Sequence, residues 1–169
     1  GGGITGAGIA RDAAMRGLST ILVEQHDLAF GTSSRSSRLI HGGLRYFEEG
    51  DLKLVFEALA ERKVLLTIAP HLVHPLPFVF PVHQGDRVPL WKIWAGIWLY
   101  DLLAAFRNVK RHRFLGKRGL LQLEPMLRDK GLQGGARYYD AQCDDARLVV
   151  ATARSAIRHG AQVANYMAV

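Results

Sequence analysis

Three glycines at the start of the chain have the spacing of a phosphate-binding loop. Residues 1–10 fit the pattern G-x-G-x-x-G-x-x-x-A, with Gly1, Gly3 and Gly6 at the three glycine positions. In a dinucleotide-binding βαβ unit these glycines permit the turn, let the backbone approach a pyrophosphate and let the helix pack closely on the sheet. The N–H groups and positive dipole end of the helix attract the phosphates. The segment therefore predicts a site for a nucleotide pyrophosphate.

An acidic residue follows this loop at the position where such units bind ribose. Residues 19–23 are apolar and β-branched and predict a buried parallel strand that ends in Glu24. A carboxylate at this point accepts hydrogen bonds from the ribose hydroxyls and disfavours a 2′-phosphate, so NAD or FAD is expected in preference to NADP. The alternative is an unrelated turn followed by a surface glutamate.

A second segment, residues 31–46, combines hydroxyl groups, arginines and a glycine pair. It reads Gly-Thr-Ser-Ser-Arg-Ser-Ser-Arg-Leu-Ile-His-Gly-Gly-Leu-Arg-Tyr. Serine and threonine bring hydrogen-bond donors with little bulk, Gly42 and Gly43 let the backbone approach a flat ring, and arginine can hold phosphate oxygens with two parallel hydrogen bonds. A flexible polar linker is the alternative, but it would expose the apolar residues Leu39, Ile40 and Leu44.

The composition is that of a globular chain with an uneven distribution of charge. Of 169 residues, 49% are hydrophobic and 22% charged, and the formal net charge is +7. The lone Cys143 excludes an internal disulfide and is expected to be a small buried or half-exposed residue, not a nucleophile, and no Cys/His cluster predicts a metal site. A basic segment, residues 107–118, contains Arg107, Lys110, Arg111, Arg113, Lys117 and Arg118. Such a segment forms a solvated surface or attracts a small anion, an anionic lipid or nucleic acid.

Periodicity and helix-breaking residues predict the elements that position these segments. Helices are expected over residues 7–17, 51–69, 90–106 and 145–159. The first has an apolar face of Ile9, Ala10, Ala13, Ala14 and Leu18. The second can be capped by Asp51 and has an apolar side of Leu52, Val55, Phe56, Leu59, Leu66 and Ile68. Prolines 75, 77, 81 and 89 are expected to break residues 70–89 into short extended pieces, and residues 162–169 start a strand.

The helix predicted over residues 90–106 contains all three tryptophans, Trp91, Trp94 and Trp98. It is short and contains Lys92 and Asp101, which disfavours a membrane span. It either packs on the protein's own core or lies in a membrane interface beside the basic segment.

The order of these elements predicts the fold class and the domain organisation. We expect an α/β chain with a Rossmann-like nucleotide-binding domain over residues 1–69 and 141–169, interrupted over residues 70–140 by part of an α+β substrate domain. No strand and no initiator Met precede Gly1. We therefore expect a piece of a longer protein, without its first strand and its C-terminal part, that neither folds stably alone nor binds the cofactor.

Over its whole length the chain resembles the FAD-dependent glycerol-3-phosphate dehydrogenases, respiratory enzymes of the glycine-oxidase-like flavoprotein superfamily. The resemblance rests on the glycine loop, Thr32-Ser33-Ser34, Ser36 to Tyr46 (S-S-R-L-I-H-G-G-L-R-Y), Glu57 to Arg62, Ala69 to Leu72 and Asp144 to Leu148 (D-D-A-R-L). The glycine loop alone would indicate only a superfamily, whereas the motifs Ser36 to Tyr46 and Asp144 to Leu148 are far more specific.

The resemblance implies a set of site residues. Cofactor contacts are implied for Gly1, Gly3, Gly6, Glu24, Thr32, Ser33, Ser34, Ser37, Leu39, His41, Gly42, Gly43, Leu44 and Val169, and substrate contacts for Arg45 and Tyr46. Arg45 suits a phosphate dianion because its guanidinium is planar and always charged. No catalytic base is assigned; the remaining active-site residues are expected beyond Val169.

The resemblance also implies the reaction and the partners. FAD would accept a hydride from C2 of sn-glycerol 3-phosphate, giving dihydroxyacetone phosphate, and electrons would pass to a membrane quinone. An anionic lipid surface, no nucleic acid, a homodimer and, in a bacterium, peripheral attachment to the cytoplasmic face of the inner membrane are expected. The alternatives are a related FAD oxidase using oxygen or another substrate, an NAD dehydrogenase, and a non-catalytic basic module that binds membrane or nucleic acid.

Overall fold

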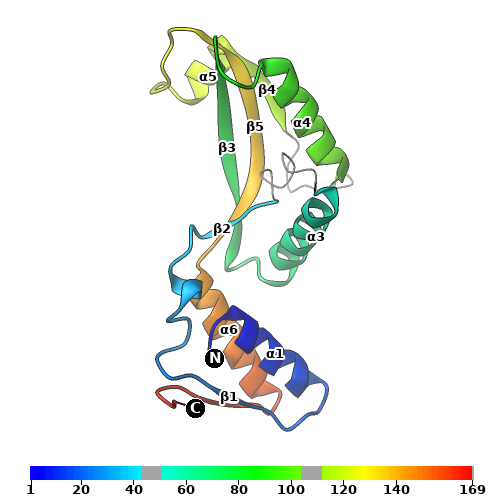
Figure 1. Cartoon of the computed structure of the whole chain (residues 1–169), viewed down its shortest axis with the longest axis vertical. Helices are drawn as coiled ribbons and strands as arrows, with labels where there is room; N and C mark the ends of the chain where they lie inside the picture. The colour runs from blue at the N-terminus through cyan, green and yellow to red at the C-terminus, as the bar shows by residue number, and fades with distance from the viewer. Residues whose placement is uncertain (43–50, 104–111, 169) are drawn as a thin grey trace. The chain divides into compact units, whose positions relative to one another are not determined.

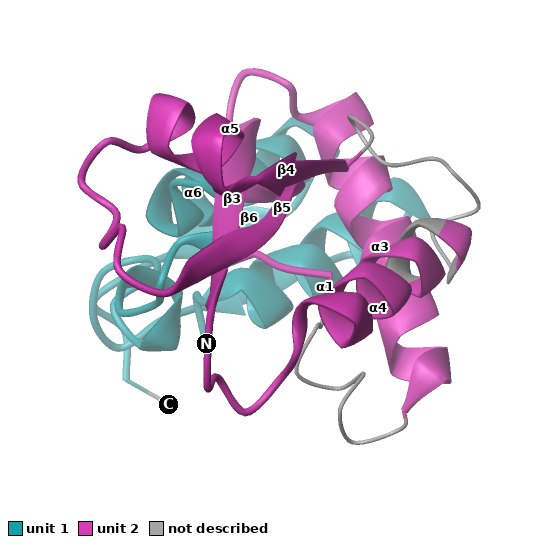
Figure 2. Cartoon of the chain, turned by 90° about the horizontal axis from the view of Figure 1, so that it is seen from above, with its two compact units in different colours: residues 1–39, 143–169 teal, residues 40–142 magenta. Residues whose placement is uncertain are grey.

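The computed structural model describes residues 1–42, 51–103 and 112–168, without the side chains of Tyr100, Asp101 and Leu103. The chain divides into two compact units, residues 1–39 with 143–169 and residues 40–142, drawn in two colours in Figure 2. In chain order the elements are α1 (Ile4–Met15), β1 (Ile21–Val23), the 3-10 helix η1 (Thr32–Ser34), β2 (Leu39–Ile40), α3 (Leu52–Ile68), β3 (Val73–His83), α4 (Leu90–Leu103), β4 (Arg113–Gly116), α5 (Lys117–Leu123), β5 (Leu132–Cys143), α6 (Asp145–Arg158) and β6 (Gln162–Ala164).

The first unit is a parallel strand pair with two helices packed against each other. Strands β1 and β6 pair in parallel, with Leu22 opposite Val163, and α1 lies beside α6 (Figure 1). Small side chains line the contact between the helices, which lets the two backbones approach closely. The buried residues of this core are Ala7, Ala10, Ala14, Leu22, Ala29, Val149, Ala153, Ala156 and Ala161. The expected α/β class is confirmed by this arrangement.

Helix α1 departs from the sequence prediction in its bounds and in the face it buries. It begins at Ile4, three residues before the expected start, and ends at Met15 ahead of Gly17, whose φ of 80° favours glycine. Ile9 and Leu18 were expected on the buried face but are 66% and 61% exposed. That part of the prediction is wrong: α6 packs against the alanine side of α1, where a side chain as large as that of Ile9 would hold the two helices apart, and Leu18 lies beyond the end of the helix.

The second unit is built around the long strand β5, which pairs with β2, β3 and β4. Phe78 of β3 stacks on Tyr138 of β5 with ring centroids 5.4 Å apart, and Gln84 donates its N–H to the Gly131 carbonyl at 2.7 Å. Strand β3 runs unbroken through Val73–His83, so the prediction of short pieces is wrong. Its prolines, residues 75, 77 and 81, all have odd numbers, and among the described strands β3 pairs with β5 alone. The missing N–H groups therefore fall on the unpaired side of an edge strand.

The predicted helices of residues 51–69 and 145–159 are confirmed, and so is the cap at Asp51; α6 has an acidic cap as well, Asp144. Asp51 accepts a hydrogen bond from Leu54 N at 3.0 Å, and Asp144 accepts one from Arg147 N at 3.1 Å. The face that α3 buries is narrower than expected, because Phe56 is 55% exposed. It consists of Val55, Leu59 and Arg62.

The compact units and the expected domains are divided at different residues. The chain passes between units after residue 39 and after residue 142, whereas the sequence places the domain boundaries after residues 69 and 140. Helix α3 contacts α4 and β3 and is therefore counted in the second unit. The assignment of 1–69, 70–140 and 141–169 to a nucleotide-binding and a substrate domain stays a prediction. None of the helices described has the length and the apolar character needed to cross a membrane.

Candidate functional site

The glycine loop is held in a conformation that leaves no space for a side chain at residue 6. A Cβ atom built on Gly6 would lie 1.9 Å from the Gly1 carbonyl oxygen and 3.5 Å from Leu22 Cδ1 of β1. A backbone atom cannot move aside as a flexible side chain can. The third glycine of the pattern is thus required by the contact between the first turn of α1, the preceding loop and the strand.

The N-terminus of α1 presents N–H groups without intrahelical partners. Gly3 is the N-cap, so no side chain of the cap residue satisfies these donors, and no acid lies in the first turn. Ser33 Oγ accepts from Ile4 N at 3.1 Å, and the Gly3 carbonyl accepts from Ala7 N at 2.9 Å. Within the described residues, the N–H groups of Thr5 and Gly6 have no recorded acceptor. Together with the helix dipole, these donors form a site suited to phosphate oxygens.

Glu24, directly after β1, lies against the glycine loop. Its Oε2 accepts from Gly2 N at 2.5 Å, and its Oε1 accepts from His26 N at 2.9 Å. The N–H of Gly2, followed by that of His26, holds the pKa of this carboxyl below its ordinary value, so Glu24 is ionised at neutral pH. A carboxylate has about four acceptor positions. Two of them therefore stay available to ligand hydroxyl groups.

The serine-rich segment is fixed to the same unit by hydrogen bonds at two places. Ser33 bonds the first turn of α1, as described above, and Ser36 Oγ donates to Asp145 at the start of α6. Ser34 Oγ lies 3.4 Å from the carbonyl oxygens of Phe30 and Gly31. The acid pair of the D-D-A-R-L motif therefore has a structural role here: Asp144 caps α6 and Asp145 holds the serine-rich segment.

Among the predicted cofactor residues that the structure describes, nine lie in the first unit: Gly1, Gly3, Gly6, Glu24, Thr32, Ser33, Ser34, Ser37 and Leu39. The structure brings the glycine loop, Glu24 and Ser33 together. Ser37 is exposed. The predicted residues Gly43, Leu44, Arg45, Tyr46 and Val169 lie outside the described residues, so their roles stay predictions.

His41 and Gly42 belong to the second unit, where a buried ion pair fixes the backbone. Gly42 N donates to Asp140 Oδ1 at 3.2 Å. Asp140 also pairs with the guanidinium of Arg62, which donates to the Tyr139 carbonyl at 3.3 Å as well. Arg62 is 2% exposed and Asp140 is 4% exposed. The pair thus ties α3 and β5 to the residues that lead into the segment containing Arg45.

Sequence reasoning missed Ser36, Arg62, Asp140 and Asp145 as residues that hold the site. Ser36, Arg62 and Asp145 lie within motifs of the resemblance. For Arg62, the sequence offered one signal: a charged residue on the apolar side of a predicted helix. Their partners lie far along the chain and have no local signature.

Cys143 is buried as expected; burial, followed by the charges of Asp145 and Asp144, raises the pKa of its thiol to about 11. It is therefore a protonated thiol at neutral pH and a poor nucleophile.

Similarities to known proteins agree with this geometry. Residues 1–169 match the family described as FAD dependent oxidoreductase. A protein of Synechocystis sp. named glycerol-3-phosphate dehydrogenase is 49% identical over all of this chain, which spans 31% of that relative. The solved glycerol-3-phosphate dehydrogenase from Bacillus halodurans, complexed with FAD, is 34% identical with a TM-score of 0.71, and this chain covers 26% of it.

A more distant likeness extends to the glycine oxidases. The glycine oxidase from Bacillus cereus has a TM-score of 0.61 over 98% of this chain and 44% of its own, at 19% identity, which is a likeness of fold alone. The resemblance inferred from the motifs is confirmed by these findings, and so is FAD as the cofactor of the family. The chain spans about a third or less of the glycerol-3-phosphate dehydrogenases compared here.

Alanine substitutions at two neighbouring glycines test the loop geometry. Gly6→Ala forces a side chain onto the Gly1 carbonyl and is expected to destabilise the protein by about 1–3 kcal/mol or more. Gly8→Ala, in the same helix with nothing within 4 Å of the new Cβ, is expected to stabilise it by about 0.5–1 kcal/mol. Urea unfolding measures both. Equal effects of the two substitutions would contradict the assigned contact.

Removing one member of the buried ion pair tests its role. Arg62→Met leaves Asp140 buried without its cation and is expected to destabilise the protein by about 3–5 kcal/mol. The matched control is Lys53→Met on the same helix, which removes an exposed pair with Glu57 at 3.9 Å and should cost about 0–1 kcal/mol. Denaturant unfolding gives both values. A cost for Arg62→Met no greater than that of Lys53→Met would refute the role of the pair.

Proposed function

The chain belongs to the FAD dependent oxidoreductase family, and from this membership we propose that the whole protein oxidises sn-glycerol 3-phosphate to dihydroxyacetone phosphate. The observation that carries the proposal is the assembly of the glycine loop, the open N-terminus of α1 and Glu24 at one place in the first unit. The substrate is inferred from the Arg45-containing motif and from relatives named glycerol-3-phosphate dehydrogenase.

The residues of the first unit fit FAD. The N–H groups of Thr5 and Gly6, which have no recorded acceptor among the described residues, suit its pyrophosphate oxygens, because Gly6 lets the first turn of α1 pack directly against the Gly1 carbonyl. The free acceptor positions of the Glu24 carboxylate suit the ribose hydroxyls. We propose that Ser37, Leu39, His41 and Gly42 contact the flavin half and that the backbone near Val169 contacts adenine.

The chemistry of the reaction divides between the cofactor and the protein. FAD, when bound, supplies an acceptor for the hydride that leaves C2 of the alcohol. The protein must hold the phosphoryl group of the substrate, which is the role we propose for Arg45 beside Tyr46. A base must take the proton of the C2 hydroxyl. We propose that this base belongs to a part of the protein beyond these 169 residues.

The reduced flavin could pass its electrons to either of two acceptors. We propose a membrane quinone, with a related oxidase that uses oxygen as the alternative. The exposed apolar face of α4 favours the quinone because it suits a protein attached to a membrane. An NAD dehydrogenase and a non-catalytic basic module are both disfavoured by membership of an FAD-dependent family. A homodimer, no interaction with nucleic acid and a lack of FAD binding by the 169 residues alone stay predictions.

We propose that α4 attaches the protein peripherally to an anionic lipid surface, in a bacterium the cytoplasmic face of the inner membrane. Trp91, Trp94 and Trp98 are 65%, 42% and 55% exposed, and Leu102 is 58% exposed. Tryptophan favours the boundary between water and lipid. The basic segment 107–118 follows the helix along the chain and would add electrostatic attraction to anionic headgroups.

Substitution of Arg45 tests the assigned substrate. In the full-length protein, Arg45→Ala is expected to raise the KM for glycerol 3-phosphate by about tenfold or more, because it removes charge-assisted hydrogen bonds of about 1.5–3 kcal/mol. The FAD content, measured from flavin absorption, should be unchanged. Arg128→Ala, an exposed arginine of the second unit, is the control and should alter neither value. A colourless wild-type protein would refute the flavoenzyme, and equal loss of FAD and substrate affinity would give Arg45 a structural role.

Vesicle binding tests the attachment surface. Replacing Trp91, Trp94 and Trp98 by Ala in the full-length protein is expected to reduce co-sedimentation with anionic vesicles by about tenfold or more, since each tryptophan can bury about 150–250 Å². Neutralising the six cations of the basic segment should reduce it further and make the remainder insensitive to salt. Phe56→Ala, which removes an exposed aromatic residue of α3, is the control. Unchanged vesicle binding in the tryptophan variant would refute the attachment surface and would indicate that α4 packs on the protein's own core.

A further inference from the structure

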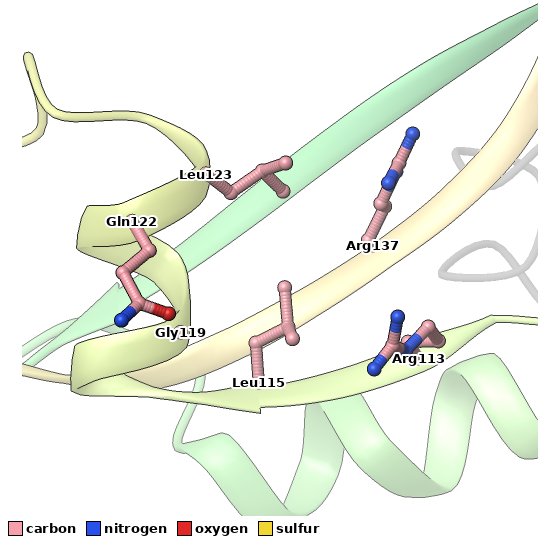
Figure 3. Close-up of a pocket in the computed structure, with 6 residues that line it drawn as sticks. All are labelled: Arg113, Leu115, Gly119, Gln122, Leu123 and Arg137. Atoms are coloured by element: carbon pink, nitrogen blue, oxygen red, sulfur yellow. The ribbon is translucent and has the colours of Figure 1, made fainter.

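The second unit contains a pocket of about 340 Å³ between α5 and the strands β4 and β5. Figure 3 shows Arg113 and Arg137 rising from neighbouring strands on one side of this pocket, with Gln122 and Leu123 of α5 on the other. Leu115 and Gly119 complete the lining. The lining thus holds two cations, an amide and two apolar side chains, but no acidic residue.

The pairing of the strands sets the two arginines beside each other. Strands β4 and β5 are antiparallel, and Arg113 lies directly opposite Arg137 in their register. Residues directly opposite on paired strands share one face of the sheet, where like charges are destabilising. A sheet that holds two guanidinium groups in this register therefore gains stability from an anion placed between them.

The two arginines have no counterion within the described part of the chain. Among the described residues neither Arg113 nor Arg137 has a recorded ion pair, and the acid Asp129 is paired with Lys117 at 2.5 Å. The Nε atom of Arg137 is buried and has no hydrogen-bond partner in the described structure. The guanidinium of Arg137 lies over the ring of Tyr139, at 5.2 Å from the ring centroid. A buried donor without an acceptor points to a missing ligand.

The opposite face of β4 is already occupied. His112 and Phe114 contact the rings of Trp98 and Trp94, with centroids 5.4 Å and 5.0 Å apart. Because side chains alternate along a strand, Arg113 and Leu115 point to the other face, where the pocket lies. The pocket is therefore distinct from the contact between the tryptophan helix α4 and β4.

We propose that this pocket binds a phosphoryl group, carried either by a small phosphate ester or by a lipid headgroup. Two guanidinium groups on one side can hold several oxygens of a tetrahedral oxyanion by charge-assisted hydrogen bonds. Leu115 and Leu123 offer an apolar wall, and Gln122 an amide, for the remainder of the ligand. A volume of about 340 Å³ exceeds what one phosphate needs and lies at the lower end of the range for ligand pockets.

Titration with inorganic phosphate tests the site in the full-length protein. Calorimetry at constant ionic strength should give saturable binding, and Arg113→Gln and Arg137→Gln should each weaken it by about tenfold or more. Arg113→Lys and Arg137→Lys keep the charge but lose the planar guanidinium, so they should bind phosphate with intermediate affinity. They take the place of the glutamine variants if those fold poorly. Arg128→Gln is the control for a general loss of positive charge. Arg45→Gln separates this pocket from the proposed substrate site and should leave the pocket's phosphate binding intact.

A second arm identifies the source of the phosphoryl group. Phosphatidylcholine vesicles with and without phosphatidic acid are compared for the wild type and the two glutamine variants. Loss of phosphatidic acid-dependent binding in those variants assigns a lipid headgroup, and unchanged vesicle binding with weakened phosphate binding assigns a small ester. The proposal is overturned by absence of saturable phosphate binding, by equal weakening in Arg128→Gln, or by a loss confined to Arg45→Gln.

Discussion

The carbonyl oxygen of Gly1 occupies the space in which a side chain of residue 6 would lie, and the candidate nucleotide site depends on this contact. It sets how closely the first turn of α1 follows the loop, and so where the N–H groups of that turn point. Glu24 reinforces the arrangement, because its carboxylate accepts the N–H of Gly2. Ser33 fixes the next segment to the same turn. The loop, the acid and the serine therefore form one hydrogen-bonded assembly around the end of a helix.

The parts of this assembly that the sequence predicts are those with a local physical cause. Glycine spacing, an acid at the end of a strand and an acid before an apolar helix each act over a few residues, which is why Glu24, Asp51 and the start of α6 could be located. Long-range contacts leave no such pattern. Ile9 was assigned to the wrong face of α1 because the choice depends on the alanines of α6. The continuous strand β3 was missed because its prolines are tolerated only at a sheet edge, which the sequence does not reveal.

A buried charge in the second unit illustrates the same limit. Arg62 lies on the apolar side of α3, where sequence reasoning expects hydrophobic residues, and it is stable there because Asp140 of β5 supplies the opposite charge. Asp140 in turn accepts from Gly42 N. One carboxylate thus satisfies both a cation and a backbone donor, and a substitution at either partner leaves the other unsatisfied at a considerable cost.

Strand β5 makes the strongest case for a ligand in the second unit, because it carries charge on both of its faces. Side chains alternate along a strand, so Asp140 and Arg137 point to opposite faces. On the face of Asp140 the protein provides the counterion itself, through Arg62. On the face of Arg137 the residue opposite in register is a second arginine, and the buried Nε has no acceptor among the described residues. Asp140 has its counterion within the protein, whereas Arg137 and Arg113 have none among the described residues. We therefore attribute the missing counterion to an anionic ligand that comes from outside the chain.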